Sequence, residues 1–145
     1  MSTKENQESI ELYQKNLDNE IDGIAIYRLL IEAESNEDRR SIFEELAAVE
    51  QRHADTWRAK LREVGAEPRE NSPSLKARLV GLLDRRFGVM TVLPIVRSME
   101  AGAYQAYMAQ GETAQSLAPE ERDHGRTLAR MSLTTDSVAT IATRE

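Results

Sequence analysis

Apolar side chains recur along most of the chain at spacings of three and four residues, which is the period of an amphipathic α-helix. The pattern predicts four long helices, over residues 6–34, 36–64 and 89–110 and from about residue 118 onwards. A shorter amphipathic helix is predicted over residues 75–86, after a polar connection that contains two prolines. We therefore expect an all-α fold: an antiparallel four-helix bundle with an extra short helix between its second and third helices.

Residues that favour caps and turns set the predicted ends of these helices. Asn36 suits the N-cap of the second helix, and Gly65 suits its end. Pro119 suits the first turn of the last helix, where its missing N–H has no helical partner in any case. This start leaves residues 112–118 as an awkward return between the third and fourth helices, which an exchange of helices between two chains would relieve.

Each long helix carries a carboxylate on its otherwise apolar stripe. The second and fourth helices add a histidine three residues after that carboxylate, and these are the two histidines of the chain. Residues three apart in a helix project from one face, so each pair directs a carboxylate and an imidazole to one point. The six inward polar residues are Glu20, Glu50, His53, Glu100, Glu121 and His124.

The register of the predicted hairpins supports a common level for these carboxylates. In an antiparallel hairpin, residues at one level are equidistant from the turn. Glu20 and Glu50 are equidistant from the turn that the sequence signals between the first two helices. Glu100 and Glu121 are equidistant from residues 110–111, where a glycine again favours a break.

Four glutamates and two histidines that converge in a helical bundle are the ligand set of carboxylate-bridged di-iron centres. Four carboxylates neutralise the four positive charges of two ferrous ions, and each imidazole adds a neutral nitrogen ligand. Manganese suits the same donors, so the residue types leave the choice between the two metals open. The alternative is a metal-free bundle with ordinary exposed pairs, although inward placement argues against it because burying an unpaired glutamate is costly.

Two tyrosines share the stripes of these residues and are candidates for positions next to the metal carboxylates. Tyr27 follows the glutamate of the first helix by seven residues, and Tyr104 follows the glutamate of the third by four. The alternative for each is a core position without a role at the metal. Trp57 is expected to pack in the core, and no catalytic side chain apart from the metal ligands is predicted.

The composition excludes several other classes of function. A net charge of −6 argues against a nucleic-acid partner, since phosphate binding needs a basic face. The absence of cysteine excludes disulfides, thiol catalysis and cysteine-ligated iron. The N-terminal residues lack the apolar core of a signal peptide, and no apolar run of 18 residues occurs, so we expect a cytoplasmic location.

The segments that carry the six residues resemble the ferritin-like superfamily, and in particular its rubrerythrin-type domains. They read DNEIDGIAIYRLL, EELAAVEQRHADTW and APEERDHGRTLARM. The stretch LVGLLDRRFGVMTVLPIVRSMEAGAYQAY is similar to the erythrin domain of membrane-bound ferritins, in which a vacuolar-iron-transporter-like membrane region follows. The resemblance covers about residues 8–132. It implies one domain over residues 1–145, cut from a longer membrane protein, with two iron ions on Glu20, Glu50, His53, Glu100, Glu121 and His124.

The resemblance also implies a function, with one departure from the family's pattern. Ferrous iron would be the substrate and oxygen or hydrogen peroxide the oxidant, in the oxidation, sequestration or export of iron; a catalytic protein would then be a ferroxidase-type oxidoreductase. Rubrerythrin-type sites usually carry a second carboxylate on the third helix, where this sequence has Arg97 and Ala103. That departure puts peroxide reduction in doubt.

Two alternative functions stay open at this point: an iron-sensing or iron-loading module with little turnover, and a rubrerythrin-like peroxidase. We expect a homodimer, with or without exchanged helices, because residues 75–87 carry more apolar surface than a connector needs. A membrane iron transporter, fused or separate, is the other partner that the resemblance implies.

Overall fold

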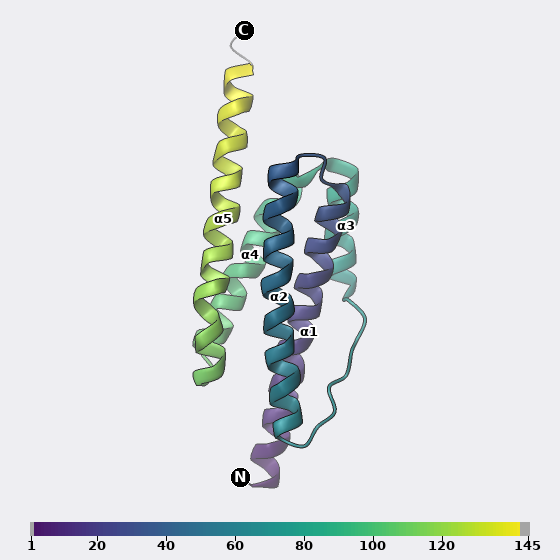
Figure 1. Ribbon diagram of the computed structural model, residues 1–145, viewed down its shortest axis with the longest axis vertical. Helices are drawn as coiled ribbons and strands as arrows, with labels where there is room; N and C mark the ends of the chain where they lie inside the picture. The colour runs from purple at the N-terminus through teal and green to yellow at the C-terminus, as the bar shows by residue number, and fades with distance from the viewer. Residues whose placement is uncertain (1, 143–145) are drawn as a thin grey trace. The chain divides into compact units, whose positions relative to one another are not determined.

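The computed structural model describes residues 2–142, with side chains described as far as Ser132. Five helices follow one another along the described chain: α1 (Thr3–Ala33), α2 (Glu37–Glu63), α3 (Leu75–Phe87), α4 (Val89–Met108) and α5 (Glu112–Ala142) (Figure 1). Residues 2–142 contain no strand, which confirms the predicted all-α class. Helix α3 is the predicted short helix between the second and third long helices. The chain divides into two compact units, Met1–Leu82 and Leu83–Glu145. A single domain over residues 1–145 stays a prediction.

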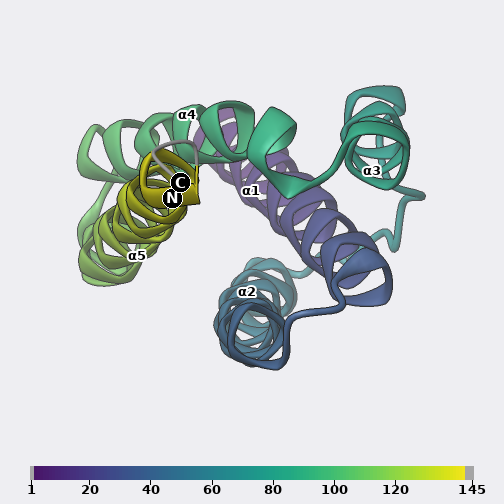
Figure 2. The same ribbon diagram turned by 90° about the horizontal axis from the view of Figure 1, so that it is seen from above.

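The first unit is built on the hairpin of α1 and α2 (Figure 2). Its turn is short because the buried carboxylate of Glu34 organises it: Oε1 accepts the Asn36 backbone N–H at 3.0 Å and the Arg39 guanidinium at 2.9 Å. The Asn36 side chain in turn accepts the Arg39 backbone N–H at 2.9 Å. The predicted N-cap of the second helix is thus confirmed.

The C-terminus of α2 closes on a glycine, as predicted. Gly65 has a φ of 81°, a conformation that side chains with a Cβ rarely adopt. The Ala66 N–H donates to the Leu61 carbonyl at 2.9 Å, and the Gly65 N–H donates to the Arg62 carbonyl at 3.0 Å. This pair of bonds is the Schellman arrangement, and it satisfies carbonyls that the helix end would leave unbonded.

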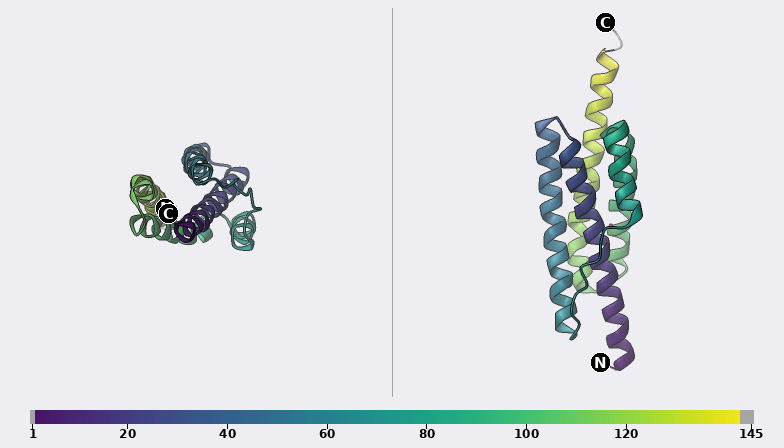
Figure 3. Two further views of the ribbon diagram at one scale, coloured as in Figure 1. Left: turned by 90° about the horizontal axis from the view of Figure 1, so that it is seen from below. Right: turned by 90° about the vertical axis from the view of Figure 1, so that its right-hand side faces the viewer.

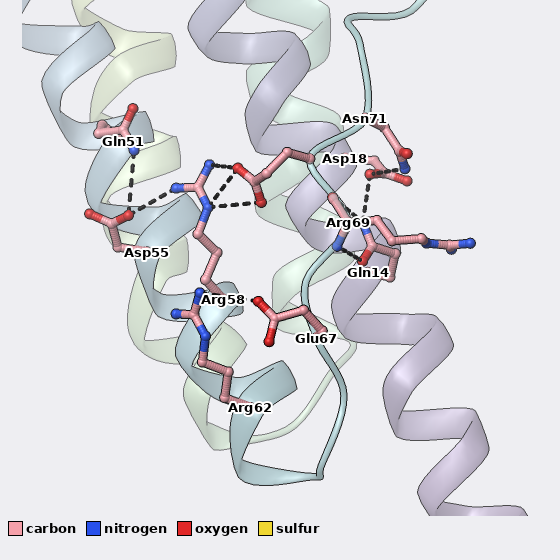
Figure 4. Close-up of polar contacts among 10 residues, drawn as sticks. Gln14, Asp18, Gln51, Asp55, Arg58, Arg62, Glu67, Arg69 and Asn71 are labelled. Carbon is pink, nitrogen blue, oxygen red and sulfur yellow. Dashed lines mark hydrogen bonds and ion pairs between the residues drawn. The ribbon is translucent and has the colours of Figure 1, made fainter.

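Residues 66–74, which we call the strap, run back along α1 to the start of α3 (Figure 3). Three polar side chains of α1, spaced four residues apart, hold the strap by hydrogen bonds, and Figure 4 shows the first two, Gln14 and Asp18. Gln14 exchanges two bonds of 3.0 Å with the Arg69 backbone, Asp18 accepts from Asn71 at 2.9 Å, and Asp22 accepts from the Ser74 N–H at 2.7 Å. Because residues four apart share a helix face, one polar stripe of α1 fixes the whole connection.

The strap is also tied to α2. The Arg58 guanidinium donates to Glu70 in the strap at 2.9 Å and pairs with Asp55, one turn away on its own helix, also at 2.9 Å. The hydrogen bond to Glu70 raises the pKa of Arg58 above its ordinary value. The connection therefore bridges both helices of the hairpin.

Packing in the first unit places aromatic side chains between its helices. Trp57 is fully buried and stacks on Tyr13 at a centroid distance of 5.6 Å, which confirms its predicted core position. Helix α3 approaches α1 closely at Gly81, where a Cβ would lie 2.3 Å from Cδ1 of Leu29. Only glycine permits this approach without a shift of the neighbouring side chain.

The second unit is built on the hairpin of α4 and α5, and here one prediction was wrong. Helix α5 begins at Glu112, so residues 112–118 are helical and Pro119 lies inside the helix. The side chain of Gln115 explains the early start: it donates to the carbonyls of Met108 and Gln110 at 3.3 and 2.9 Å, which closes the end of α4. The missing N–H of Pro119 removes one helical bond, while burial of neighbouring alanines on this turn favours the helix.

The early start of α5 removes the difficulty of the predicted return. Glu121 now lies more than two turns into its helix, and the turn at residues 109–111 lies midway between Glu100 and Glu121. The register argument therefore located this turn correctly, although the proline signal did not. In the described part of the chain, none of the helices combines the length and apolar character needed to cross a membrane.

Candidate metal centre

The first unit brings together three of the predicted ligands. Glu20 lies in the middle of α1, and Glu50 and His53 lie one turn apart on the facing side of α2. The Nδ1 atom of His53 is 3.5 Å from Oε1 of Glu20 and 4.0 Å from Oε2 of Glu50. All three side chains are buried, so two carboxylates and an imidazole meet inside a hairpin core.

The second unit repeats this arrangement with the other three predicted ligands. Glu100 lies on α4, and Glu121 and His124 lie one turn apart on α5. The Nδ1 atom of His124 is 3.5 Å from Oε2 of Glu100, the same separation as in the first unit. Glu121 has a ligand atom within 4.8 Å of both, and all three residues are buried.

The two units thus carry the same motif on the same type of hairpin. In each, a single glutamate comes from the first helix, and a glutamate and a histidine come from the second. Each motif faces inward because its position coincides with the apolar stripe of its helix, where neighbours such as Leu17 and Leu128 are fully buried. The two hairpins therefore share one local geometry at these residues.

Gly23 makes room for this geometry, and sequence reasoning missed it. It lies one turn after Glu20 on α1, and a Cβ built there would lie 3.5 Å from Oε2 of Glu50. Alanine would be in ordinary contact with that carboxylate, while any longer side chain would displace it. The available signal was a glycine in a helix interior, which costs about 1 kcal/mol relative to alanine and often marks a close approach.

The donor geometry suits a metal ion. Two donors that each lie about 2.1 Å from one ion are about 3.0 Å apart at a right angle and about 4.2 Å apart in line. The separations of 3.5 and 4.0 Å between Nδ1 and the carboxylate oxygens lie in this range and exceed the usual N–H···O hydrogen-bond length. Carboxylate and imidazole donors also suit iron and manganese. Each unit therefore has a buried Glu/Glu/His group that could hold a metal ion.

The remaining candidates have different surroundings. Tyr27 is buried in the first unit, with its ring 6.4 Å from that of Phe43. Tyr104 is half-buried in the second unit, and the guanidinium of Arg122 lies over its ring at 5.8 Å. Arg97 is exposed to solvent rather than directed into the core. A role for either tyrosine beside a metal stays a prediction.

Comparison with known proteins gives the family of this chain. The model of the rubrerythrin family matches residues 11–132, which is most of the sequence and includes all six predicted ligands. The chain belongs to the rubrerythrin family. Searches of curated proteins and of solved structures gave no significant match.

Membership of the rubrerythrin family accounts for the fold and for the buried groups together. The family is ferritin-like, which confirms the predicted fold class, and rubrerythrin-type domains bind iron. The buried carboxylate and histidine groups are where such a domain would hold metal. Among the described residues of α4, the position three after Glu100 is an alanine, Ala103, and the position three before it is Arg97.

Proposed function

We propose that this chain binds a pair of iron ions through Glu20, Glu50, His53, Glu100, Glu121 and His124, and that it oxidises ferrous iron. The observation that carries the proposal is the repeated buried group, in which an imidazole Nδ1 lies 3.5 Å from a carboxylate of the facing helix in each hairpin. Together the six side chains supply four negative charges and two neutral nitrogens. That set balances two divalent cations in a buried environment.

The protein residues contribute charge, position and exclusion of water to this reaction. The pair of ferrous ions would supply two electrons to the oxidant in one event; dioxygen, for example, takes up two protons and leaves as hydrogen peroxide. Glu20 and Glu50 lie on the two helices of one hairpin, which the strap stabilises through hydrogen bonds to both. Gly23 leaves space beside the Glu50 carboxylate, from which a Cβ built there would be 3.5 Å away.

Ala103 favours ferrous oxidation over repeated peroxide reduction. Rubrerythrin-type sites usually carry a further carboxylate near this position of the third long helix, and such a ligand allows iron to change partners when its charge changes. Ala103 has no donor atom, and Arg97, on the other side of Glu100, is exposed. A rubrerythrin-like peroxidase is therefore the less favoured function.

The test compares two oxidants on the iron-loaded protein. Anaerobic protein with two equivalents of ferrous iron is mixed with oxygen or with hydrogen peroxide, and iron oxidation is followed by absorbance. We expect oxidation in a single round with both, and slow peroxide turnover when an electron donor is supplied. Ala103→Glu should increase peroxide turnover.

Two results would overturn parts of this proposal. If the protein did not accelerate ferrous oxidation relative to protein-free buffer, the remaining function would be that of an iron-sensing or iron-loading module, which binds iron without turnover. Rapid peroxide reduction over many turnovers by the unaltered protein would show that the missing carboxylate is not needed. The matched control is Glu45→Gln, which removes an exposed carboxylate from α2 and should leave every rate unchanged.

The proposal extends to handling of iron for storage or export, with a membrane iron transporter as the partner. The support is the resemblance of residues 8–132 to the erythrin domain of membrane-bound ferritins. Delivery of iron to such a partner would use the same six ligands.

A further inference from the structure

A groove lies between α4 and α5 in the second unit, and its walls are basic. It has a volume of about 570 Å³, which is within the range of pockets that hold small organic molecules. Three arginines line it, Arg97 from α4 and Arg122 and Arg126 from α5. A single carboxylate, that of Glu121, faces them, so the charge of the groove is clearly positive.

The arginines of the groove differ from three arginines of the first unit. Arg39, Arg58 and Arg62 each pair with a carboxylate, at 2.9 to 3.8 Å. Among the side chains that the structure describes, no carboxylate forms an ion pair with any of the three arginines of the groove. In this chain of net charge −6, three arginines thus gather in one groove, where Glu121 is the one acidic residue among those that line it.

A glycine also lines the groove. Gly125 lies on α5 between Arg122 and Arg126, and a Cβ built there would meet nothing within 4 Å. Packing therefore does not require glycine at this position, although glycine in a helix interior costs about 1 kcal/mol relative to alanine. A small side chain would therefore fit at this position of the lining.

We propose that this groove binds a small organic polyanion that carries phosphate or carboxylate groups. The planar guanidinium group donates two parallel hydrogen bonds to either group, so three arginines suit a ligand with two or three negative charges. Tyr104, whose ring already carries the Arg122 guanidinium, fixes the direction of one donor. This inference does not rest on the proposed oxidation of iron.

Calorimetric titration of the metal-free protein tests the proposal. Pyrophosphate and citrate are the probes, one for each kind of anionic group, and acetate is the control of low charge. We expect one site per chain for at least one of the two probes, with binding that weakens as salt is added. Binding of pyrophosphate alone identifies a phosphate site, and binding of citrate alone identifies a polycarboxylate site.

Variants of the groove locate the site. Arg122→Gln and Arg126→Gln should each weaken binding about tenfold or more, because each removes a charged hydrogen-bond donor. Arg78→Gln makes the same change of charge on the exposed face of α3 and should have no effect. Gly125→Glu should abolish binding by adding an acid to the lining of the groove, while Gly125→Ala should keep it, and helical circular dichroism checks that both fold.

Two results would overturn the inference. If neither pyrophosphate nor citrate bound at low salt, the groove would not be an anion site. An equal loss of affinity in Arg78→Gln and in the groove variants would show attraction to general positive charge instead of a defined site.

Discussion

The two hairpins carry the same metal motif in different surroundings. In the first unit, the strap is bonded to α1 and α2, and Arg58 and Arg62 of α2 pair with acids of the strap. In the second unit, prolines lie inside both helices, and no carboxylate among the described side chains forms an ion pair with the arginines of the groove. The Nδ1-to-carboxylate separation of 3.5 Å is nevertheless the same in both.

This comparison separates what the motif needs from what its surroundings add. Two antiparallel helices and the correct register are sufficient to bring a glutamate and the Glu-x-x-His pair together. The strap instead adds stability to one hairpin, and the open basic groove gives the other a surface for a ligand. The following predictions test this division, beginning with the largest expected effect.

Removal of either histidine tests whether the two units contribute equally to metal binding. His53→Ala and His124→Ala should each lower the number of bound ferrous ions from about two to one or none, because each removes the nitrogen ligand of one group. Metal content after equilibrium dialysis measures the change, and circular dichroism checks the fold. Full binding by either variant would show that its histidine is not a ligand.

A pair of glycine variants distinguishes the two units sharply. Gly23→Leu should strongly weaken metal binding, since a Cβ there already lies 3.5 Å from the Glu50 carboxylate. Gly125→Leu is the matched change in the second unit, where a Cβ meets nothing within 4 Å, and it should leave metal binding intact. Equal loss of bound iron in both variants would contradict the assigned role of Gly23.

The close approach of α3 to α1 predicts a clear loss of stability on substitution. Gly81→Val should lower the free energy of unfolding by about 1 to 3 kcal/mol, because the added atoms overlap Leu29. Urea denaturation measures the change. Gly102→Val is the control, at a helical glycine with open space around its Cβ, and an equal effect there would point to helix propensity alone.

The exposed face of α3 predicts self-association. Leu75, Leu79 and Leu82 lie one turn apart and are 82, 52 and 55 % exposed, so they form an apolar stripe that a second copy of the chain could cover. We expect a homodimer, and Leu79→Lys should shift it towards monomer in light scattering. A monomeric mass for the unaltered protein at micromolar concentration would refute the dimer.

The smallest expected effect concerns the strap. Asp22→Ala removes two hydrogen bonds to Ser74 and should lower the free energy of unfolding by about 1 kcal/mol, since both bonds are exposed to solvent. Asp123→Ala is the control on the exposed face of α5. Iron stoichiometry should stay at its original value in both variants; a loss in Asp22→Ala would mean that the strap positions the ligands as well as stabilising the hairpin.

The sequence predicts most of this fold because its signals are local and periodic. Helix periodicity, the Asn36 cap and the Gly65 stop depend on neighbours within one or two turns, and all three were correct. The predicted start of the last helix was wrong because the preference of proline for a first turn was weighed above the register of the hairpin. The side chain of Gln115, which closes the turn, carries no such signal in the sequence.

The candidate site was predictable in its residues and less so in its surroundings. The spacing of Glu50 and His53 implies a shared face whatever the tertiary structure, and the same holds for Glu121 and His124. The space that Gly23 leaves for a carboxylate and the groove beside Arg122 depend on contacts between helices. Such contacts join residues far apart in the sequence, so no local sequence pattern predicts them.

The most direct test of the central claim is a ferrous titration of the metal-free protein without oxygen. Two buried Glu/Glu/His groups predict saturation at about two ions per chain, with both ions lost or one retained when a ligand histidine is removed. The titration is followed by calorimetry and by metal analysis of the dialysed protein. Saturation at a single ion, or no binding at all, would contradict the assignment of the six residues as ligands of an iron pair.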